Sequence, residues 1–174
     1  RGLGDVYKRQ GEMWVTLTAT NKIANKRNAE ELARIDSQEF VSSAYISGDT
    51  KGFTYPTEQE LRYKIGSQIM MINNDKNGNW VNGTVATITH VNGNNPQQPL
   101  ISARTEDGRI ISFSYNTWEI TSPKAGKHGL DYDVIGSFTQ LPFKLAWAIT
   151  IHKSQGQTLN NAIIDLTGGT PVSY

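Results

Sequence analysis

A short apolar, β-branched run opens the patterned part of the chain. Residues 13–20, Met-Trp-Val-Thr-Leu-Thr-Ala-Thr, are typical of a short strand buried on both faces. A helical pattern follows, which Asn21 can cap, and its apolar stripe recurs at spacings of four, four and three: Ala24, Asn28, Leu32 and Ile35. A strand followed directly by a helix predicts half of a βαβ unit.

The pattern changes near Leu61. Residues 61–121 form short β-branched runs separated by Asn-Gly and Asp-Gly dipeptides, which are strong hairpin signals. Three strands are predicted, at residues 67–73, 84–91 and 109–115. A meander of roughly sixty residues favours a small β-barrel.

The α/β texture returns after Pro123. The Gly-rich residues 125–129 are interpreted as a linker, an apolar pattern resumes at 138–151, and a strand is predicted at 162–166. Gly156 suits the C-terminal end of a helix. The order α/β, all-β, α/β is best explained by a small barrel inserted into a loop of one α/β domain.

These patterns divide the chain into five parts. Residues 11–60 are expected to form the first part of the α/β domain, 61–122 the inserted barrel, and 123–169 the second part of the α/β domain. Residues 1–10 and 170–174 resemble translated sequencing-adapter sequence, so we exclude them from the fold prediction. Ordinary flexible termini are the alternative interpretation of both ends.

Composition narrows the function classes. With 174 residues, 37% of them hydrophobic, the chain can bury a core and is not a disordered tail. The absence of Cys excludes a disulfide framework and a thiolate metal site, and the cytoplasm is the expected compartment. No apolar run approaches the ~20 residues of a membrane span, so no membrane partner is expected. A net charge of +1 means that any nucleic-acid affinity must come from a local groove.

Polar groups crowd behind an apolar segment at residues 146–159. Within two helical turns this stretch carries hydroxyl, imidazole, ammonium and amide groups, which together suit phosphate oxygens: Thr150, His152, Lys153, Ser154 and Gln155. Gly156 allows a ligand to approach the backbone closely. The alternative is that His152 and Lys153 only stabilise a helix C-terminus, where cations are favoured.

The run Thr-Ile-His-Lys-Ser-Gln-Gly at 150–156, preceded by Ala-Trp-Ala, resembles motif V of Pif/RecD-like superfamily-one DNA helicases. In that family motif V lies in the second RecA-like domain and couples ATP hydrolysis to stepping along DNA. The resemblance implies that Thr150, His152 and Lys153 face the phosphates of single-stranded DNA. It also implies that Gln155, Gly156 and Thr158 lie nearer the ATP cleft.

Two further segments resemble the same family. Residues 17–28 resemble the segment that opens the second RecA-like domain, which singles out Thr20, Asn21 and Asn28. Helix capping by Thr20 or Asn21 and backbone bonding by Asn28 are favoured over ligand binding. Residues 64–84 resemble the start of the family's SH3-like insert, in which Trp80 is expected to pack the barrel core rather than to stack on a base. Trp118 is likewise expected to pack the core rather than to stack on a base.

The expected fold is therefore α/β: an incomplete RecA-like domain of the P-loop NTPase type, interrupted by a small SH3-like β-barrel. The chain contains no Gly-x-x-x-x-Gly-Lys-Ser/Thr phosphate loop and stops before the arginine of motif VI. We therefore expect no catalytic residue and no ATPase activity in this part. The resemblance implies that the full-length protein moves 5′ to 3′ on single-stranded DNA with ATP and Mg²⁺, and that the missing first RecA-like domain is a partner.

A competing interpretation is a stand-alone single-strand nucleic-acid-binding module, with the barrel as its active part. No metal site is expected. Asp131 and Asp133 are interpreted as part of a solvated loop, and His90 and His128 have no second ligand at metal spacing.

Overall fold

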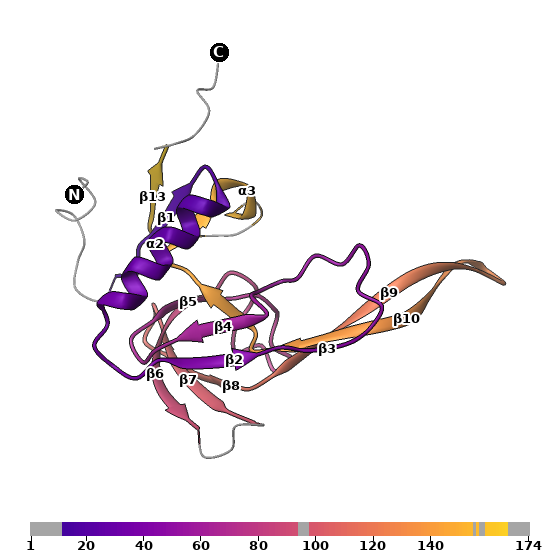
Figure 1. Ribbon diagram of the computed structural model, residues 1–174, viewed down its shortest axis with the longest axis horizontal. Helices are drawn as coiled ribbons and strands as arrows, with labels where there is room; N and C mark the ends of the chain where they lie inside the picture. The colour runs from indigo at the N-terminus through magenta and orange to yellow at the C-terminus, as the bar shows by residue number, and fades with distance from the viewer. Residues whose placement is uncertain (1–11, 94–97, 155, 157–158, 167–174) are drawn as a thin grey trace, which may run out of the picture.

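The computed structural model describes residues 12–93, 98–154, 156 and 159–166. One end of the molecule is a parallel three-stranded sheet in the order β12-β1-β13 (Figure 1). Its central strand β1, Val15–Thr18, pairs with β12, Ala148–Thr150, and with β13, Ala162–Asp165. The predicted strands at 13–20 and 162–166 are thus confirmed, and the parallel pairing brings the two ends of the α/β part together.

Helix α2, Asn21–Arg34, follows β1 and packs against the parallel sheet. The predicted stripe is confirmed for Ala24, Asn28 and Leu32, which are buried. The hydroxyl of Thr20, not the Asn21 side chain, caps the helix by accepting a hydrogen bond from the Ile23 amide at 3.3 Å. Asn21 instead occupies the first helical position, because Thr20 has the extended backbone that an N-cap requires.

A five-stranded antiparallel sheet has the order β11-β5-β6-β7-β8. Its strands are β5 Gln68–Met71, β6 Val85–Asn92, β7 Leu100–Thr105, β8 Ile110–Phe113 and β11 Phe143–Leu145. The three strands predicted between residues 67 and 115 are present as β5, β6 and β8. Strand β11 joins this sheet from outside residues 61–122, through pairing of Phe143 with Met71.

The expected barrel is not seen closed, because no ladder between described residues connects the edge strands β8 and β11. The edge strands have four and three residues, and β11 comes from outside the predicted insert, so pairing with another part of the chain, rather than closure on itself, completes this sheet. A two-stranded ladder of β2, Phe40–Ser43, and β4, Glu60–Tyr63, contributes to the same core. Leu61 and Tyr63 of β4 pack there with Ile69, Trp80 and Phe143.

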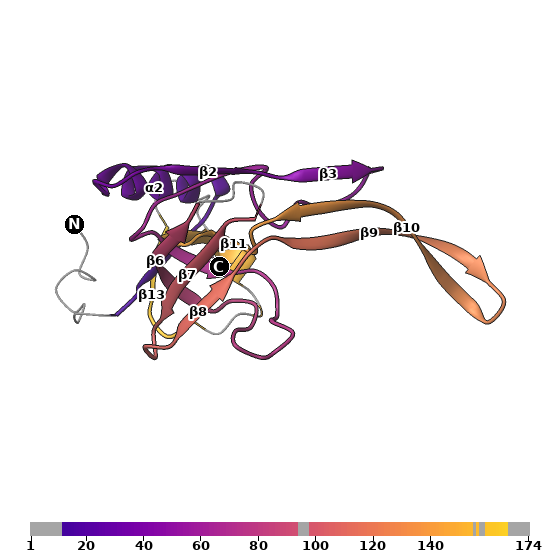
Figure 2. The same ribbon diagram turned by 90° about the horizontal axis from the view of Figure 1, so that it is seen from below.

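A long hairpin projects from the body of the molecule (Figures 1 and 2). It consists of β9, Asn116–Gly126, and β10, Gly129–Gln140, and the short strand β3, Tyr45–Gly48, pairs with the base of β10. The prediction of a linker at 125–129 was wrong, since Ala125 pairs with Leu130 at the hairpin end. A Gly-rich turn and a Gly-rich linker have the same local composition, and only the pairing of the flanking residues separates them.

The prediction that Asp131 and Asp133 belong to a solvated loop was also wrong. Both residues lie in β10, and the exposed carboxylate of Asp133 pairs with Lys124 across the hairpin at 2.8 Å. Alternation of these carboxylates with Leu130, Tyr132 and Val134 is the period-two pattern of a strand. None of the helices in the described part of the chain is long and apolar enough to cross a membrane.

Candidate nucleic-acid interface

The side chain of Asn28 holds the start of β12 from helix α2. Its Nδ2 donates to the Ala148 carbonyl at 2.9 Å and, at 3.5 Å, to the Leu145 carbonyl, while its Oδ1 accepts from the Ala148 amide at 2.8 Å. Only 8% of Asn28 is exposed, so these bonds satisfy buried groups. The predicted backbone-bonding role of Asn28 is confirmed, and its effect is to fix the strand that leads into the motif V residues.

Strand β12 leads directly into a single helical turn, α3, Ile151–Ser154. Thr150 is buried, and its hydroxyl accepts a hydrogen bond from the Lys153 amide at 3.1 Å. The side chains of His152 and Lys153 are exposed, whereas Ser154 turns back and donates to the Ile151 carbonyl at 2.7 Å. Thr150 therefore shapes the turn, and His152 and Lys153 present their polar groups to solvent.

Gly156 has a φ of +80°, a left-handed conformation that glycine adopts without strain, in keeping with its predicted place after a helix. Gln155 and Thr158, the other two residues expected near the nucleotide, lie outside the described residues. The structure thus places four of the six candidate residues, Thr150, His152, Lys153 and Gly156, and does not test their roles toward DNA or ATP.

A cleft of about 720 Å³ lies beside the motif V turn. Helix α2 forms one wall through Asn21, Asn25 and Asn28, residues 55–62 form the second, and strands β11 and β12 with α3 complete it. Thr150, Lys153 and Lys144 also line the cleft. The lining therefore combines amide groups and apolar side chains with charged groups of both signs: Lys144, Lys153, Arg62, Glu58 and Glu60.

Lys144 is a functional candidate that the sequence analysis missed. Burial, and secondly the charge of Lys153, lower the pKa of its ammonium group to about 8. Its side chain makes no hydrogen bond or ion pair with any described residue. A lysine inside the apolar run 141–149 is the sequence signal that could have identified it.

Neither of the two candidate base-stacking tryptophans lines this cleft. Trp80 is 8% exposed, packs edge-on against Phe113 with ring centroids 6.0 Å apart, and donates from Nε1 to Asn73 at 2.8 Å. Trp80 is thus a core residue, as expected. Trp118 lies in β9 with its ring 5.9 Å from that of Phe138.

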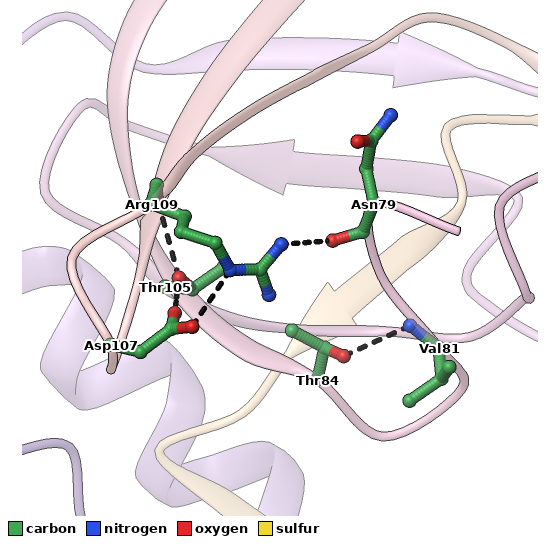
Figure 3. A network of polar contacts seen from close by, with 6 residues as sticks. All are labelled: Asn79, Val81, Thr84, Thr105, Asp107 and Arg109. Carbon is green, nitrogen blue, oxygen red and sulfur yellow. Dashed lines mark hydrogen bonds and ion pairs between the residues drawn. The ribbon is translucent and has the colours of Figure 1, made fainter. Parts of the chain in front are cut away.

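A polar network fixes the turn between β7 and β8 (Figure 3). Arg109 donates from Nη1 to the Asn79 carbonyl at 2.8 Å and from Nε to Asp107 at 2.7 Å, and the hydroxyl of Thr105 also donates to Asp107. The hydrogen bond from Thr105, followed by that from Arg109, lowers the pKa of the exposed Asp107 carboxyl. The network therefore ties two turns of the five-stranded sheet together.

The same turn contacts the segment that follows motif V. Asn160 donates from Nδ2 to the Glu106 carboxylate at 2.6 Å, and Gly156 and Asn160 line a smaller cavity of about 370 Å³ with the turn. The five-stranded sheet thus contacts the segment that follows motif V through Glu106. Within the described ranges, no cluster of three or more His, Cys, Asp or Glu side chains could hold a metal ion.

The chain resembles helicases of one group over most of its length. It is 33% identical to the ATP-dependent DNA helicase Pif1 of Bdellovibrio bacteriovorus over 149 residues, which are 83% of this chain and 31% of that protein. The structure of unliganded Pif1 from Bacteroides sp. superposes with a TM-score of 0.81 at 27% identity, covering 95% of this chain and 37% of that one. Bacteroides Pif1 bound to single-stranded DNA gives a TM-score of 0.70 at 30% identity, covering 87% and 34%. No family model matches the chain.

The parallel sheet with its packed helix, the motif V turn and these likenesses define part of a superfamily-one helicase with a RecA-like fold. Within that class the chain belongs to the Pif1-like helicases. The chain spans 31% of the length of the Bdellovibrio relative. Family membership therefore does not by itself establish the activity, substrates and partners of the whole protein.

Proposed function

We propose that the chain is the DNA-gripping part of an ATP-dependent DNA helicase that moves 5′ to 3′ along single-stranded DNA. The observation that carries this proposal is the turn at residues 150–154, which is fixed from behind by Asn28 and presents His152 and Lys153 to solvent beside an amide-lined cleft. Imidazole and ammonium donors on a rigid turn suit a phosphate backbone, because phosphate contacts position a strand without reading its sequence.

The proposal assigns two sides to motif V. Thr150, His152 and Lys153 serve the DNA side: Thr150 shapes the turn through its hydrogen bond with the Lys153 amide, and the other two bind phosphates. Gln155, Gly156 and Thr158 serve the nucleotide side. ATP and Mg²⁺ are held by the full-length protein, in which a first RecA-like domain supplies the phosphate loop and completes the cleft.

The proposed domain organisation assigns residues 11–60 and 123–169 to the second RecA-like domain and 61–122 to an SH3-like insert. Strands β5 to β8, all within residues 61–122, form four consecutive strands of one antiparallel sheet and support a folded insert. The core of this sheet is shared with Phe40, Leu141 and Phe143, which lie outside the insert. The hydrogen bond from Asn160 to Glu106 connects the insert to the segment that follows motif V.

Replacement of both His152 and Lys153 by alanine is expected to weaken binding of a labelled oligothymidine to the 174-residue chain at least about tenfold at low salt. The slope of log affinity against log salt should fall by about 0.7 for each lost phosphate contact. Fluorescence anisotropy across a salt series measures both quantities. The control removes charges from the exposed face of α2, Lys22→Ala/Lys26→Ala, and should bind like the wild type.

Unchanged binding by the His152→Ala/Lys153→Ala chain would contradict the assignment and favour the five-stranded sheet as an independent binding module. In the full-length protein, the proposal expects unwinding of duplexes with a 5′ single-stranded tail. Unwinding of 3′-tailed duplexes alone would contradict the direction of movement.

A further inference from the structure

Lys144 occupies an unusual position in strand β11. Its neighbours Phe143 and Leu145 pack in or against the core of the five-stranded sheet, while the side chain of Lys144 extends into the cleft beside α2. The backbone of Lys144 pairs with Met70 of β5. The ammonium group is thus delivered to the cleft by a rigid strand rather than by a loop.

The cleft gives this ammonium group no protein acceptor among the described residues. The cleft-lining residues of α2 are uncharged, and α3, which follows β12, contributes a second cation, Lys153. Residues 55–62 contribute Glu58, Glu60 and Arg62 to the lining. Glu60 accepts a hydrogen bond from Ser43, and Arg62 pairs with Glu39. Neither Glu58 nor Glu60 is among the groups that shift the pKa of Lys144, which are burial first and Lys153 second.

A half-buried cation that faces another cation and lacks an acceptor destabilises the folded chain. Such an arrangement is stabilised when an anion enters, because the anion then interacts with both charges in a partly desolvated site. A phosphate group is negatively charged, and its oxygens can accept hydrogen bonds from two ammonium groups that line the same cleft.

We propose that Lys144 is a further phosphate-binding residue, which together with Lys153 grips one phosphodiester group of a single strand lying in the cleft beside α2. This inference rests on the proposed function and adds a residue outside motif V to the binding surface. The cleft of about 720 Å³ is lined by Thr150 and Lys153 of the motif V turn and by Asn21 and Asn25 of α2, so it has room and polar groups for more of a strand than one phosphate.

Binding of a phosphate by Lys144 should change the protonation of its ammonium group. In the free chain the pKa of Lys144 is about 8, and a bound phosphate raises it, since a nearby opposite charge favours the protonated form. DNA binding should therefore take up a substantial fraction of a proton at Lys144 near pH 8 and far less near pH 6.5. Affinity should fall as the pH rises from 8 to 9.5.

The test uses the whole 174-residue chain, an oligothymidine probe and three variants: Lys144→Met, Lys144→Arg and the exposed control Lys26→Met. Calorimetry in buffers of different ionisation enthalpy gives the proton uptake, and anisotropy gives the affinity. Lys144→Met should bind about tenfold more weakly at pH 7, with a salt slope smaller by about 0.7 and no proton uptake at pH 8. Lys144→Arg should bind at both pH 7 and pH 9.5 without proton uptake, because the guanidinium stays charged.

The outcomes separate this inference from the proposed function. If His152→Ala/Lys153→Ala weakens binding but Lys144→Met behaves like Lys26→Met in affinity and proton uptake, the Lys144 inference is overturned and the proposed function stands. If His152→Ala/Lys153→Ala leaves the affinity for oligothymidine unchanged while Lys144→Met reduces it, Lys144 binds DNA without Lys153. That result would overturn both the shared phosphate site and the role proposed for motif V. Displacement of the oligonucleotide by ATP or inorganic phosphate at equal phosphate concentration would assign the lysine pair to a small anion and overturn the inference.

Folding of the Lys144→Met chain gives a further check. The pKa of Lys144 is lower in the folded chain than its ordinary value of 10.5, so its charge opposes folding at pH 7. Stability of the wild type should rise between about pH 8 and 10.5, where the unfolded chain still holds the proton that the folded chain has released. Lys144→Met should unfold at higher urea concentration than the wild type at pH 7 and lose this pH dependence.

Discussion

Replacement of Asn28 by alanine is expected to lower the free energy of unfolding by about 3 kcal/mol. The substitution removes the hydrogen bonds to both backbone groups of Ala148, at 2.8 and 2.9 Å, and leaves a buried amide and a buried carbonyl without partners. Each unsatisfied buried group costs about 1–3 kcal/mol, and the higher helix propensity of alanine offsets about 0.5 kcal/mol of the loss. Urea unfolding followed by circular dichroism measures the change.

Asn25→Ala is the matched control for Asn28→Ala. Asn25 lies one turn earlier on the same helix and is exposed, so the same exchange should leave the stability unchanged or raise it by a few tenths of a kcal/mol. Asn28→Asp adds a second test: its carboxylate still accepts from the Ala148 amide but faces the Ala148 carbonyl without a donor. Equal stability of the Asn25 and Asn28 alanine variants would show that the hydrogen bonds from Asn28 to Ala148, the clamp on β12, contribute nothing to the stability of the fold.

The clamp illustrates what the sequence could predict. Asn28 interrupts an otherwise apolar helical stripe, and a polar residue at such a position needs a buried partner, so its backbone-bonding role followed from local spacing alone. Its partner Ala148 lies 120 positions away, and no local pattern identifies it. The same holds for β11, whose pairing with β5 joins residues about seventy positions apart.

The sequence prediction left alternatives open, or was wrong, where one local composition allows two structures. Either Thr20 or Asn21 can cap a helix, and only the extended backbone of Thr20 decides between them. The glycines near residue 126 suit a linker as well as a hairpin turn, and the cross-strand pairs of β9 and β10 decide that case. Both decisions depend on where the flanking backbone runs in three dimensions.

The candidate site shows a similar division. His152 and Lys153 stand in a recognisable run of residues, so their importance was predicted from sequence. Lys144 belongs to no motif, and its apolar neighbours suggested only a buried strand. Its significance follows from the cleft that helix α2 and residues 55–62 build around it, which is a property of tertiary structure.

Replacement of Gln140 by leucine is expected to destabilise the chain more than loss of the Asn28 clamp, by about 4 kcal/mol. The Gln140 side chain is fully buried and joins β10 to β2: its Oε1 accepts from the Ser42 hydroxyl at 2.8 Å and its Nε2 donates to the Ser42 carbonyl at 2.9 Å. Nε2 also lies within hydrogen-bond distance of the Glu58 and Gln59 carbonyls, at 3.1 and 3.2 Å. Leucine has a similar volume, so the loss reports the hydrogen bonds rather than a cavity.

Residues 58 and 59 form part of the cleft wall, so Gln140→Leu should also affect the cleft. Below the urea concentration at which it unfolds, the variant should bind oligothymidine more weakly than the wild type, because the wall opposite Lys144 and Lys153 is no longer held to β10. Gln59→Leu is the control: it makes the same exchange at an exposed side chain of the wall and should change stability by no more than about 0.5 kcal/mol. If Gln140→Leu proved as stable as Gln59→Leu, the buried amide would not be what holds this wall in place.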